Sequence, residues 1–278
     1  MATPRTIALI AGSGLAKGLE TVLEDFNSFE NLKNKFGTVS KIYWGTFNGN
    51  RVFILPRHGE TKDGNPQRSP AELVRTRGYE ANIWQLCIDE VTEVYGFSAV
   101  GSLDRKLPLA SKGVFVVPVS YGRGLAASQH SFGIHAKNVH PNMSDPFNEE
   151  LRKALVRATQ GAGYETSRYT NTPASGDGFY IYNGGDGFET PHEIAAIDKL
   201  YAQDIVPFPR LVGMTTVPEV QLCAQMGIPF AALCSNVNYA EGLSNETLVS
   251  HEQTLDVMGV AAPMIVNIAK QLLRNRLG

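Results

Sequence analysis

The sequence lacks several features on which large classes of protein depend. It contains no run rich in lysine and arginine, and its formal net charge is −2 with a pI near 6.3. A surface that binds nucleic acid or an anionic membrane through charge is therefore not expected, and a small molecule is the better hypothesis for a ligand. No apolar run approaches the length of a membrane span, and no signal peptide precedes the first expected strand. We therefore expect a cytoplasmic protein.

Cysteine is scarce, and neither cysteine nor histidine shows a metal-binding pattern. The three cysteines lie in apolar-periodic segments, with neither CxxC spacing nor an even count, so we expect small buried residues in a reducing compartment. His130, His135 and His140 recur every five residues, but no glutamate or cysteine falls at ligand spacing nearby. We expect no metal there, and instead a loop packed against a ligand or a subunit.

The composition is that of a globular protein large enough to be an enzyme. Of the 278 residues, 43% are hydrophobic and 19% are charged, which allows a full core to be buried. We expect one large α/β domain over residues 1–278.

The stretch Gly213–Val220 has the pattern of a strand that turns into a helix through a binding loop. Gly213 follows an apolar run and permits a sharp turn. Thr216 and Glu219 have the spacing of a capping box, and a proline stands in the first helical turn. A helix is therefore expected to begin at Val217.

A second strand follows this helix. The apolar run Pro229–Cys234 is expected to be a buried strand that ends in the polar segment Ser235–Asn238. The order strand, helix, strand predicts a βαβ unit whose two polar loops meet at one edge of a parallel sheet. Open α/β sheets bind ligands at that edge, so function is expected there.

Polar residues also follow the strands expected earlier in the chain. A short strand at 7–10 leads into a glycine-rich turn with Ser13, where backbone N–H groups can approach an anion. A hairpin turning at Asn48-Gly49 ends in Arg57 and His58, which suit a phosphate or carboxylate and equally suit a solvated surface pair. The strand at 91–97 ends in Ser98–Ser102, which we expect to be a third small polar loop.

An acidic residue precedes a second helix start. Phe188 and Glu189 follow a glycine-rich turn, and Thr190 with Glu193 repeats the capping-box spacing. Glu189 could serve only as a partner for the helix dipole. Because Glu189 lies next to an aromatic residue and follows a glycine-rich turn, we prefer the interpretation that it contacts a ligand.

Seven segments together carry a resemblance to a known family. They are Ala11–Gly14, Arg57–Gly59, Gly78–Trp84, Ser98–Leu103, Met143–Phe147, Gly187–Thr190 and Gly213–Val220. In this order they resemble the trimeric purine nucleoside phosphorylases and methylthioadenosine phosphorylases, almost from end to end. The resemblance implies a nucleoside phosphorylase-like α/β fold with a mixed central sheet flanked by helices. It also implies a purine-salvage pentosyltransferase that cleaves purine nucleosides with inorganic phosphate as co-substrate, forms trimers or hexamers, and needs no cofactor.

The resemblance assigns roles to individual residues. It implies a phosphate site made by Ser13, Arg57, His58, Ser98, Ala99 and Thr215. It implies a nucleoside site made by Phe188, Glu189, Met214, Asn238, His251 and His140, the last reaching into a neighbouring subunit. Among these, Asn238, Glu189 and His58 are the expected catalytic residues, because charge develops on the base and on the sugar as the glycosidic bond breaks.

Two of these residues predict the class of base. Glu189 stands where methylthioadenosine phosphorylases have a small hydroxyl residue, while Asn238 and Ala240 stand where they have two aspartates. A carboxylate accepts from N1–H and an amide donates to O6 or N7, which fits a 6-oxopurine. Inosine and guanosine are therefore the expected substrates.

Other positions leave alternatives open. His251 occupies the position that meets a 5′-hydroxyl, whereas His140 is the methylthio-type residue, so methylthioinosine or methylthioadenosine phosphorylase is the alternative. A nucleoside-binding protein without catalysis would not need the phosphate residues. The sequence also departs from the family at Asp186 and Gly187 and in the longer loop Glu60–Gly78.

Overall fold

The computed structural model describes residues 5–12, 15–60, 66–167, 176–185, 187–243 and 250–278. Its helices are α1 (Ala16–Glu20), α2 (Pro70–Arg75), α3 (Gly78–Ile88), α4 (Glu149–Gly161), α5 (Pro191–Leu200), α6 (Val217–Met226) and α7 (His251–Leu277), with 3-10 turns η1 (Ala110–Lys112) and η2 (Gly133–His135). Its strands are β1 (Ile7–Ala11), β2 (Glu24–Phe29), β3 (Lys33–Asn34), β4 (Gly37–Thr38), β5 (Ile42–Phe47), β6 (Asn50–Pro56), β7 (Glu93–Ser102), β8 (Val114–Phe115), β9 (Pro118–Arg123), β10 (Glu165–Thr166), β11 (Gly178–Tyr182), β12 (Arg210–Gly213) and β13 (Phe230–Tyr239).

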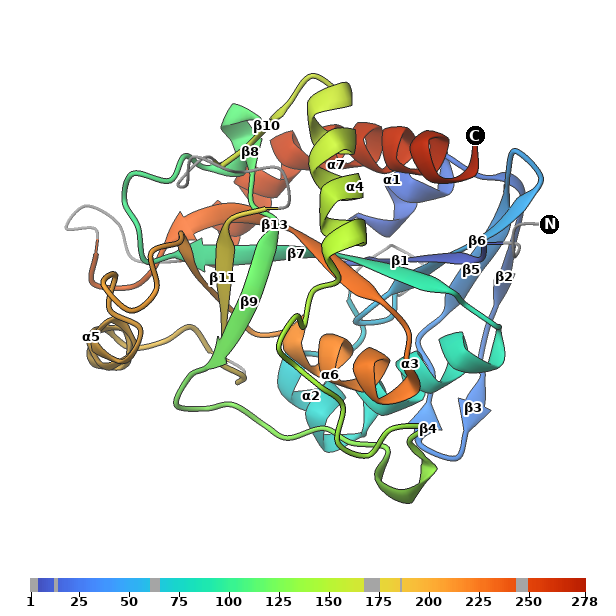
Figure 1. Cartoon of the computed structure of the whole chain (residues 1–278), viewed down its shortest axis with the longest axis horizontal. Helices are drawn as coiled ribbons and strands as arrows, with labels where there is room; N and C mark the ends of the chain where they lie inside the picture. The colour runs from blue at the N-terminus through green and yellow to red at the C-terminus, as the bar shows by residue number, and fades with distance from the viewer. Residues whose placement is uncertain (1–4, 13–14, 61–65, 168–175, 186, 244–249) are drawn as a thin grey trace.

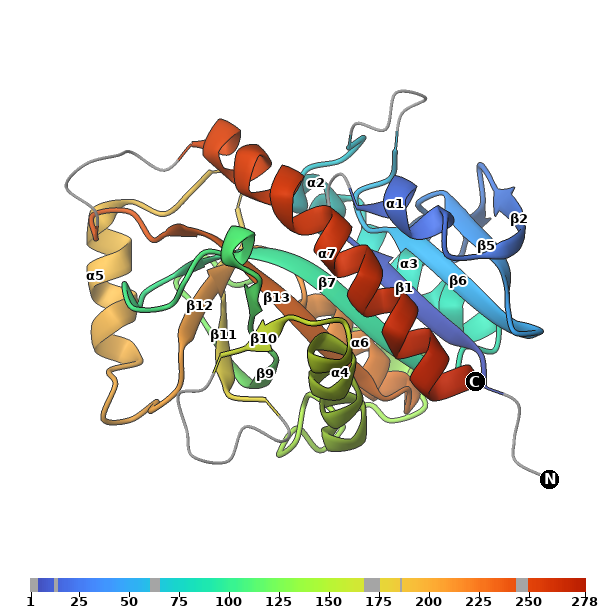
Figure 2. The ribbon, with the colours of Figure 1, turned by 90° about the horizontal axis from the view of Figure 1, so that it is seen from above.

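One mixed sheet crosses the molecule, and helices cover both of its faces (Figure 1). The strand order is β2-β5-β6-β1-β7-β12-β11-β9, and β13 also pairs with β7. The cluster of buried side chains on one face includes residues of α1, α4 and α7, and the cluster on the other face includes residues of α3 and α6. Figure 2 shows α7 lying diagonally across the first of these faces. The expected mixed α/β sheet with flanking helices is confirmed.

Two strands meet head to head on one edge of β7. β13 runs parallel along the other edge, from Phe230 opposite Val94 to Tyr239 opposite Ser102. On the edge of β7 opposite β13, β1 runs parallel to β7 as far as Gly96. β12 approaches along the same edge from the opposite direction and pairs antiparallel at Gly101 and Ser102. Among the described residues, no strand pairs with positions 97–100 on this edge. The interrupted edge lies near the middle of the sheet.

This arrangement corrects the expected parallel βαβ unit. Because β12 is antiparallel to β7 and β13 is parallel to it, the two strands around α6 run in opposite directions rather than side by side in a parallel sheet. The segments Ser98–Ser102 and Ser235–Asn238 are also not loops, since they continue β7 and β13. Pairing between these two strands supplies backbone hydrogen bonds, so small polar residues remain in regular structure.

Several local predictions are confirmed. The hairpin of β5 and β6 turns at Asn48 and Gly49, both with positive φ. α6 begins at Val217 and ends before Gly227, and Thr190 with Glu193 forms the capping box of α5. α4 begins at Glu149, where the Asn148 side chain accepts from the Leu151 N–H and caps the helix.

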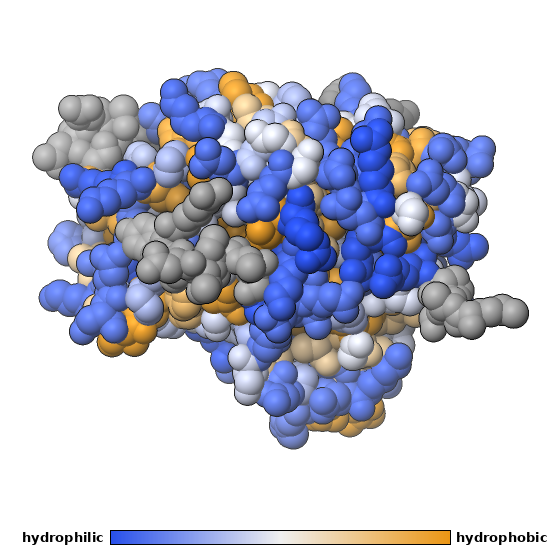
Figure 3. Space-filling view, turned by 45° about the horizontal axis from the view of Figure 1, so that its top comes forward, coloured by the Kyte–Doolittle hydropathy of each residue, from blue (hydrophilic) through white to orange (hydrophobic). Residues whose placement is uncertain are grey.

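The apolar C-terminal helix belongs to the core. By length and composition alone, Glu252–Leu277 would suit a membrane span, in contrast to the expectation from the sequence. Ile265, Ile268 and Leu272 are nevertheless buried against the sheet. The face in Figure 3 is mostly hydrophilic, with hydrophobic residues in small separate patches. One side of α7 therefore belongs to the core, while Leu255 and Val260 are exposed. Cys223 and Cys234 are buried as expected, whereas Cys87 is only half-buried.

Candidate active site

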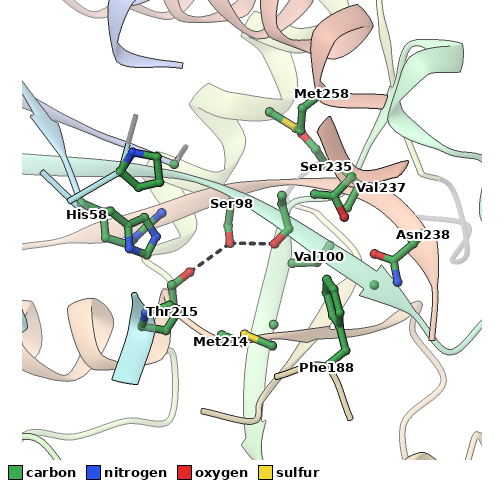
Figure 4. A pocket seen from close by; sticks show the side chains of 18 of the residues that line it. His58, Ser98, Val100, Phe188, Met214, Thr215, Ser235, Val237, Asn238 and Met258 are labelled. Carbon is green, nitrogen blue, oxygen red and sulfur yellow. Dashed lines mark hydrogen bonds between the residues drawn. The ribbon is translucent and has the colours of Figure 1, made fainter. Parts of the chain in front are cut away.

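A cavity of about 600 Å³ lies over the interrupted edge of β7. Its walls come from the ends of β1 and β6, the middle of β7, segments 66–72 and 187–189, the turn after β12, the end of β13, and α7. Figure 4 shows His58, Ser98 and Thr215 at one end of this cavity and Phe188 and Asn238 at the other, with Met214 between them. Residues from distant parts of the chain therefore share one site.

Arg57 is anchored by a carboxylate. It is 1% exposed, and its guanidinium forms a two-pronged ion pair with buried Glu219, with Nη2 to Oε2 at 2.9 Å. A third contact runs from Nη1 to the Phe97 carbonyl at 3.2 Å. Burial opposes the charge of Arg57, but the charge and hydrogen bonds of Glu219 outweigh it and raise the pKa of Arg57. The interpretation of Arg57 as a solvated surface residue is therefore wrong.

Glu219 explains why the predicted capping box at Thr216 does not form. The Thr216 side chain makes no capping hydrogen bond, and its backbone has a φ of 43°. Glu219 points instead to Arg57, because a buried guanidinium requires an anionic partner more than the helix end requires a cap. Gly213 has its own reason to be glycine: a Cβ there would lie 2.2 Å from the Tyr180 hydroxyl.

His58 is fixed in one tautomer by the segment that follows it. Its Nδ1 lies 2.9 Å from the Arg68 carbonyl, and the Arg68 N–H donates back to the His58 carbonyl at 3.0 Å. Because a carbonyl only accepts, Nδ1 carries the proton and Nε2 is left as an acceptor in the neutral ring. Burial, followed by the charge of Arg57, lowers the pKa of His58 to about 4. The ring is therefore neutral at physiological pH.

Two hydroxyls and an arginine complete this end of the cavity. The Ser98 and Thr215 hydroxyl oxygens are 3.3 Å apart, and both residues are buried. Ala99 is exposed and also lines the cavity. Arg68 also lines the cavity, with its guanidinium bound to Ser40 Oγ and the Thr38 carbonyl. This end of the cavity therefore combines positive charge with hydroxyl groups.

The opposite end offers a ring, a carboxylate and an amide. Phe188 is 44% exposed and Glu189 is half-buried. Burial raises the pKa of Glu189, and hydrogen bonds from its own backbone N–H and from the Asn183 amide, which donates to Oε1 at 3.2 Å, partly offset this. The Asn238 amide donates to the Tyr239 carbonyl at 3.2 Å and lies against Gly101, where a Cβ would approach it to 3.1 Å. A flat heterocycle with both donor and acceptor edges matches these groups.

Not every expected residue is placed in this cavity. His140 is exposed and does not line it. Ser13 and Asp186 lie outside the described residues, as does the side chain of His251. Within the part of the chain that the structure describes, no group of three histidine, cysteine or acidic side chains is arranged to hold a metal ion.

Three contributors were not found from the sequence. Glu219 has the spacing of a helix cap, Arg68 lies in the expected loop Glu60–Gly78, and no site motif marks the apolar α7 residues Leu255, Met258 and Ile265. Only the capping-box spacing at Glu219 gave a signal, and it pointed to another role. All of these residues contribute to the site through contacts with residues that are far away in the sequence.

Comparison with known proteins identifies the class. The model of the phosphorylase superfamily matches residues 6–274, so the chain belongs to that superfamily. Within it, the chain is a member of the purine nucleoside phosphorylase and methylthioadenosine phosphorylase family of enzymes.

Two curated relatives support this placement, and one solved structure shows the same fold. A probable 6-oxopurine nucleoside phosphorylase of Moorella thermoacetica is 31% identical over 256 residues, covering 91% of this chain and 86% of the relative. A probable S-methyl-5′-thioinosine phosphorylase of Methanocaldococcus jannaschii is 30% identical, covering 88% and 83%. A methylthioadenosine phosphorylase from Schistosoma mansoni, in complex with adenine, matches with a TM-score of 0.80 at 22% identity, covering 98% and 92%, which shows the shared fold.

Proposed function

We propose that this protein cleaves 6-oxopurine nucleosides with inorganic phosphate, releasing the free base and a pentose 1-phosphate. The observation that carries the proposal is that the Glu189 carboxylate and the Asn238 amide both line one end of the cavity. A 6-oxopurine donates at N1 and accepts at O6 and N7, so it complements both groups. An adenine ring has no N1–H for the carboxylate to accept.

The other end of the cavity supports phosphate as the second substrate. Arg57, Ser98 and Thr215 line it, and donors of this kind suit a tetrahedral anion. His58 joins them as a neutral ring whose Nε2 accepts the proton of a phosphate hydroxyl. Ser13 belongs to the same proposal by resemblance. The net local charge is modest, since Glu219 balances Arg57.

The two ends explain how such a reaction would be catalysed. As the glycosidic bond breaks, electrons move to the purine and positive charge develops on the sugar. Asn238 stabilises the charged base by donating to it, Glu189 holds N1–H, and the bound phosphate faces the sugar. Met214 lies between the two ends, in position to contact the pentose. Catalysis then depends on positioning and electrostatics, without a covalent intermediate on the protein.

A second candidate substrate is a 5′-methylthio-6-oxopurine nucleoside. It is favoured by the apolar wall that Leu255, Met258 and Ile265 of α7 present to the cavity. A thioether would be buried favourably against such a wall, whereas a 5′-hydroxyl would need a polar partner there. His251, at the start of α7, is the residue that would supply one.

We further propose that the enzyme is a cytoplasmic homotrimer acting in purine salvage. Its support is the loop 125–140, on which exposed Leu125 and Ile134 accompany exposed His140. In a trimer these side chains would be covered, and His140 would enter a neighbouring site. Sedimentation velocity that finds a fully active monomer would overturn this assembly.

The test of function is base release measured with and without phosphate. The substrates are inosine, guanosine, adenosine and the 5′-methylthio forms of inosine and adenosine. Phosphate-dependent release from inosine or methylthioinosine, well above release from the adenine nucleosides, is the expected result. A preference for adenine nucleosides, or release that does not depend on phosphate, would contradict the proposal.

A further inference from the structure

Glu189 does not enter the cavity with both oxygens free. Asn183, which directly follows β11, is 4% exposed and donates from Nδ2 to Glu189 Oε1 at 3.2 Å. Its own amide oxygen accepts the Ala126 N–H at 2.8 Å. One carboxylate oxygen of Glu189 is therefore already bound by the protein.

The orientation of the Asn183 amide cannot be reversed. A backbone N–H only donates, so the carbonyl oxygen of Asn183 must face Ala126, and Nδ2 must face Glu189. The backbone fixes the residue as well, because the Asn183 N–H donates to the Gly213 carbonyl at 3.0 Å. Gly124 packs against the side chain, since a Cβ there would lie 2.7 Å from Asn183 Oδ1. Asn183 is thus held on three sides.

This arrangement distinguishes two kinds of 6-oxopurine. A hypoxanthine ring presents one donor, N1–H, to a carboxylate and needs one oxygen. A guanine ring presents N1–H and a 2-amino group side by side, and its pairing is strongest when each donor has an oxygen of its own. With Oε1 bound to Asn183, the second donor of guanine would have to share that oxygen.

We propose that Asn183 is a specificity-determining positioning residue that makes the site prefer 6-oxopurines without a 2-amino group. The inference rests on the proposed function and refines it: inosine-type nucleosides are preferred over guanosine-type nucleosides. Asn183 acts through Glu189, by occupying Oε1 and orienting the carboxylate so that one oxygen meets N1–H.

The test is the ratio of kcat/KM for inosine to that for guanosine at saturating phosphate. Complete loss of one charge-assisted contact corresponds to about tenfold or more, and sharing of Oε1 weakens that contact, so the wild-type ratio should lie clearly above one and approach ten. In Asn183→Val the donor is absent and Oε1 is released, so the ratio should fall toward one. The matched control is Asn236→Val, which removes another buried amide, bound to the Leu107 and Pro108 carbonyls outside the cavity. It should keep the wild-type ratio even if it lowers the Tm.

A second measurement keeps the inference testable if Asn183→Val does not fold. Calorimetric binding of inosine and guanosine to the wild-type enzyme, with sulfate in place of phosphate, should show the same preference. A wild-type preference for guanosine, or an unchanged ratio in folded Asn183→Val, would overturn the role of Asn183. Failure of the proposed function looks different, since no nucleoside would then show phosphate-dependent cleavage, whatever the binding preference.

Discussion

The two ends of the cavity are built in different ways. At the phosphate end, the groups come from strand ends and are tied to buried partners, as Arg57 is to Glu219 and His58 is to the Arg68 carbonyl. At the base end, Phe188 and Glu189 lie on a segment between β11 and α5, and Phe188 is 44% exposed. The residues of the phosphate end therefore also stabilise the fold. Phe188 and Glu189 at the base end can be altered with little effect on the stability of the protein.

The largest effect should come from separating Arg57 from Glu219. Arg57→Ala would leave the Glu219 carboxylate buried without a partner, which costs about 3–5 kcal/mol of unfolding free energy. It should also raise the KM for phosphate far more than the KM for nucleoside. Urea denaturation and phosphate titration measure the two effects.

The control for Arg57→Ala is the double variant Arg57→Met, Glu219→Met, which removes both charges and keeps similar volume. It should recover most of the stability but not the affinity for phosphate. If the double variant is as unstable as Arg57→Ala, the ion pair does not explain the loss. An unchanged phosphate KM in Arg57→Ala would remove this residue from the phosphate site.

A smaller effect, confined to substrate choice, is expected for Asn238→Asp. An aspartate would repel O6 and accept from a 6-amino group, so inosine should lose about 2–4 kcal/mol of transition-state binding. Adenosine should gain less, because Glu189 still lacks an N1–H to accept. Measured as kcat/KM for both nucleosides, a ratio that does not move would refute Asn238 as the group that recognises O6. The melting temperature should change little.

The next effect concerns pH. Burial raises the pKa of Glu189, so this carboxyl should take up a proton at a higher pH than an ordinary glutamate. Below that pKa it no longer accepts N1–H as an anion, and kcat/KM for inosine should fall about tenfold per pH unit. The pKa of His58 is lowered to about 4, so its ring is neutral at any pH well above that value. In Glu189→Gln the acid fall should disappear. A fall that persists in Glu189→Gln and is lost in a His58 variant would assign it to the phosphate end.

The smallest effects should come from two helix caps of the same kind, one at each end of the cavity. Ser69 caps α2 beside Arg68, and Thr190 caps α5 beside Glu189, each in a complete capping box. Replacement of either by alanine should cost about 1 kcal/mol. Ser69→Ala should affect mainly the KM for phosphate, and Thr190→Ala mainly the KM for nucleoside. Equal effects of both variants on both constants would mean that the two ends are not independent.

The sequence predicts local structure well and long-range partners poorly. The Asn48-Gly49 turn, the start of α6 and the Thr190 cap depend on neighbouring residues, and all three are confirmed. Ser98–Ser102 and Ser235–Asn238 were expected to be loops because their residues are small and polar. Their strand pairing arises from chain segments more than 130 residues apart, which periodicity does not reveal.

The same limit applies to the site. Arg57 and His58 stand out as polar residues that follow an expected strand, and the structure brings both into one cavity with Thr215, which only the family resemblance indicated. Glu219 was assigned to a helix cap, because its true partner lies 162 residues away in sequence. Asn183 gave no signal, since its role depends on a backbone N–H from another segment.

The head-to-head meeting of β1 and β12 on β7 has a consequence for how the protein folds. β7 contacts residues 7–10, 211–212 and 230–239, so the binding cavity joins the beginning and the end of the chain. Contacts of such large sequence separation form late and slowly, because loop-closure entropy must be overcome first. A partly folded chain in which residues 7–10 or residues 211–239 have not yet paired with β7 has no complete cavity. During refolding, nucleoside binding should therefore return only with the final cooperative step, after most of the helical signal has recovered.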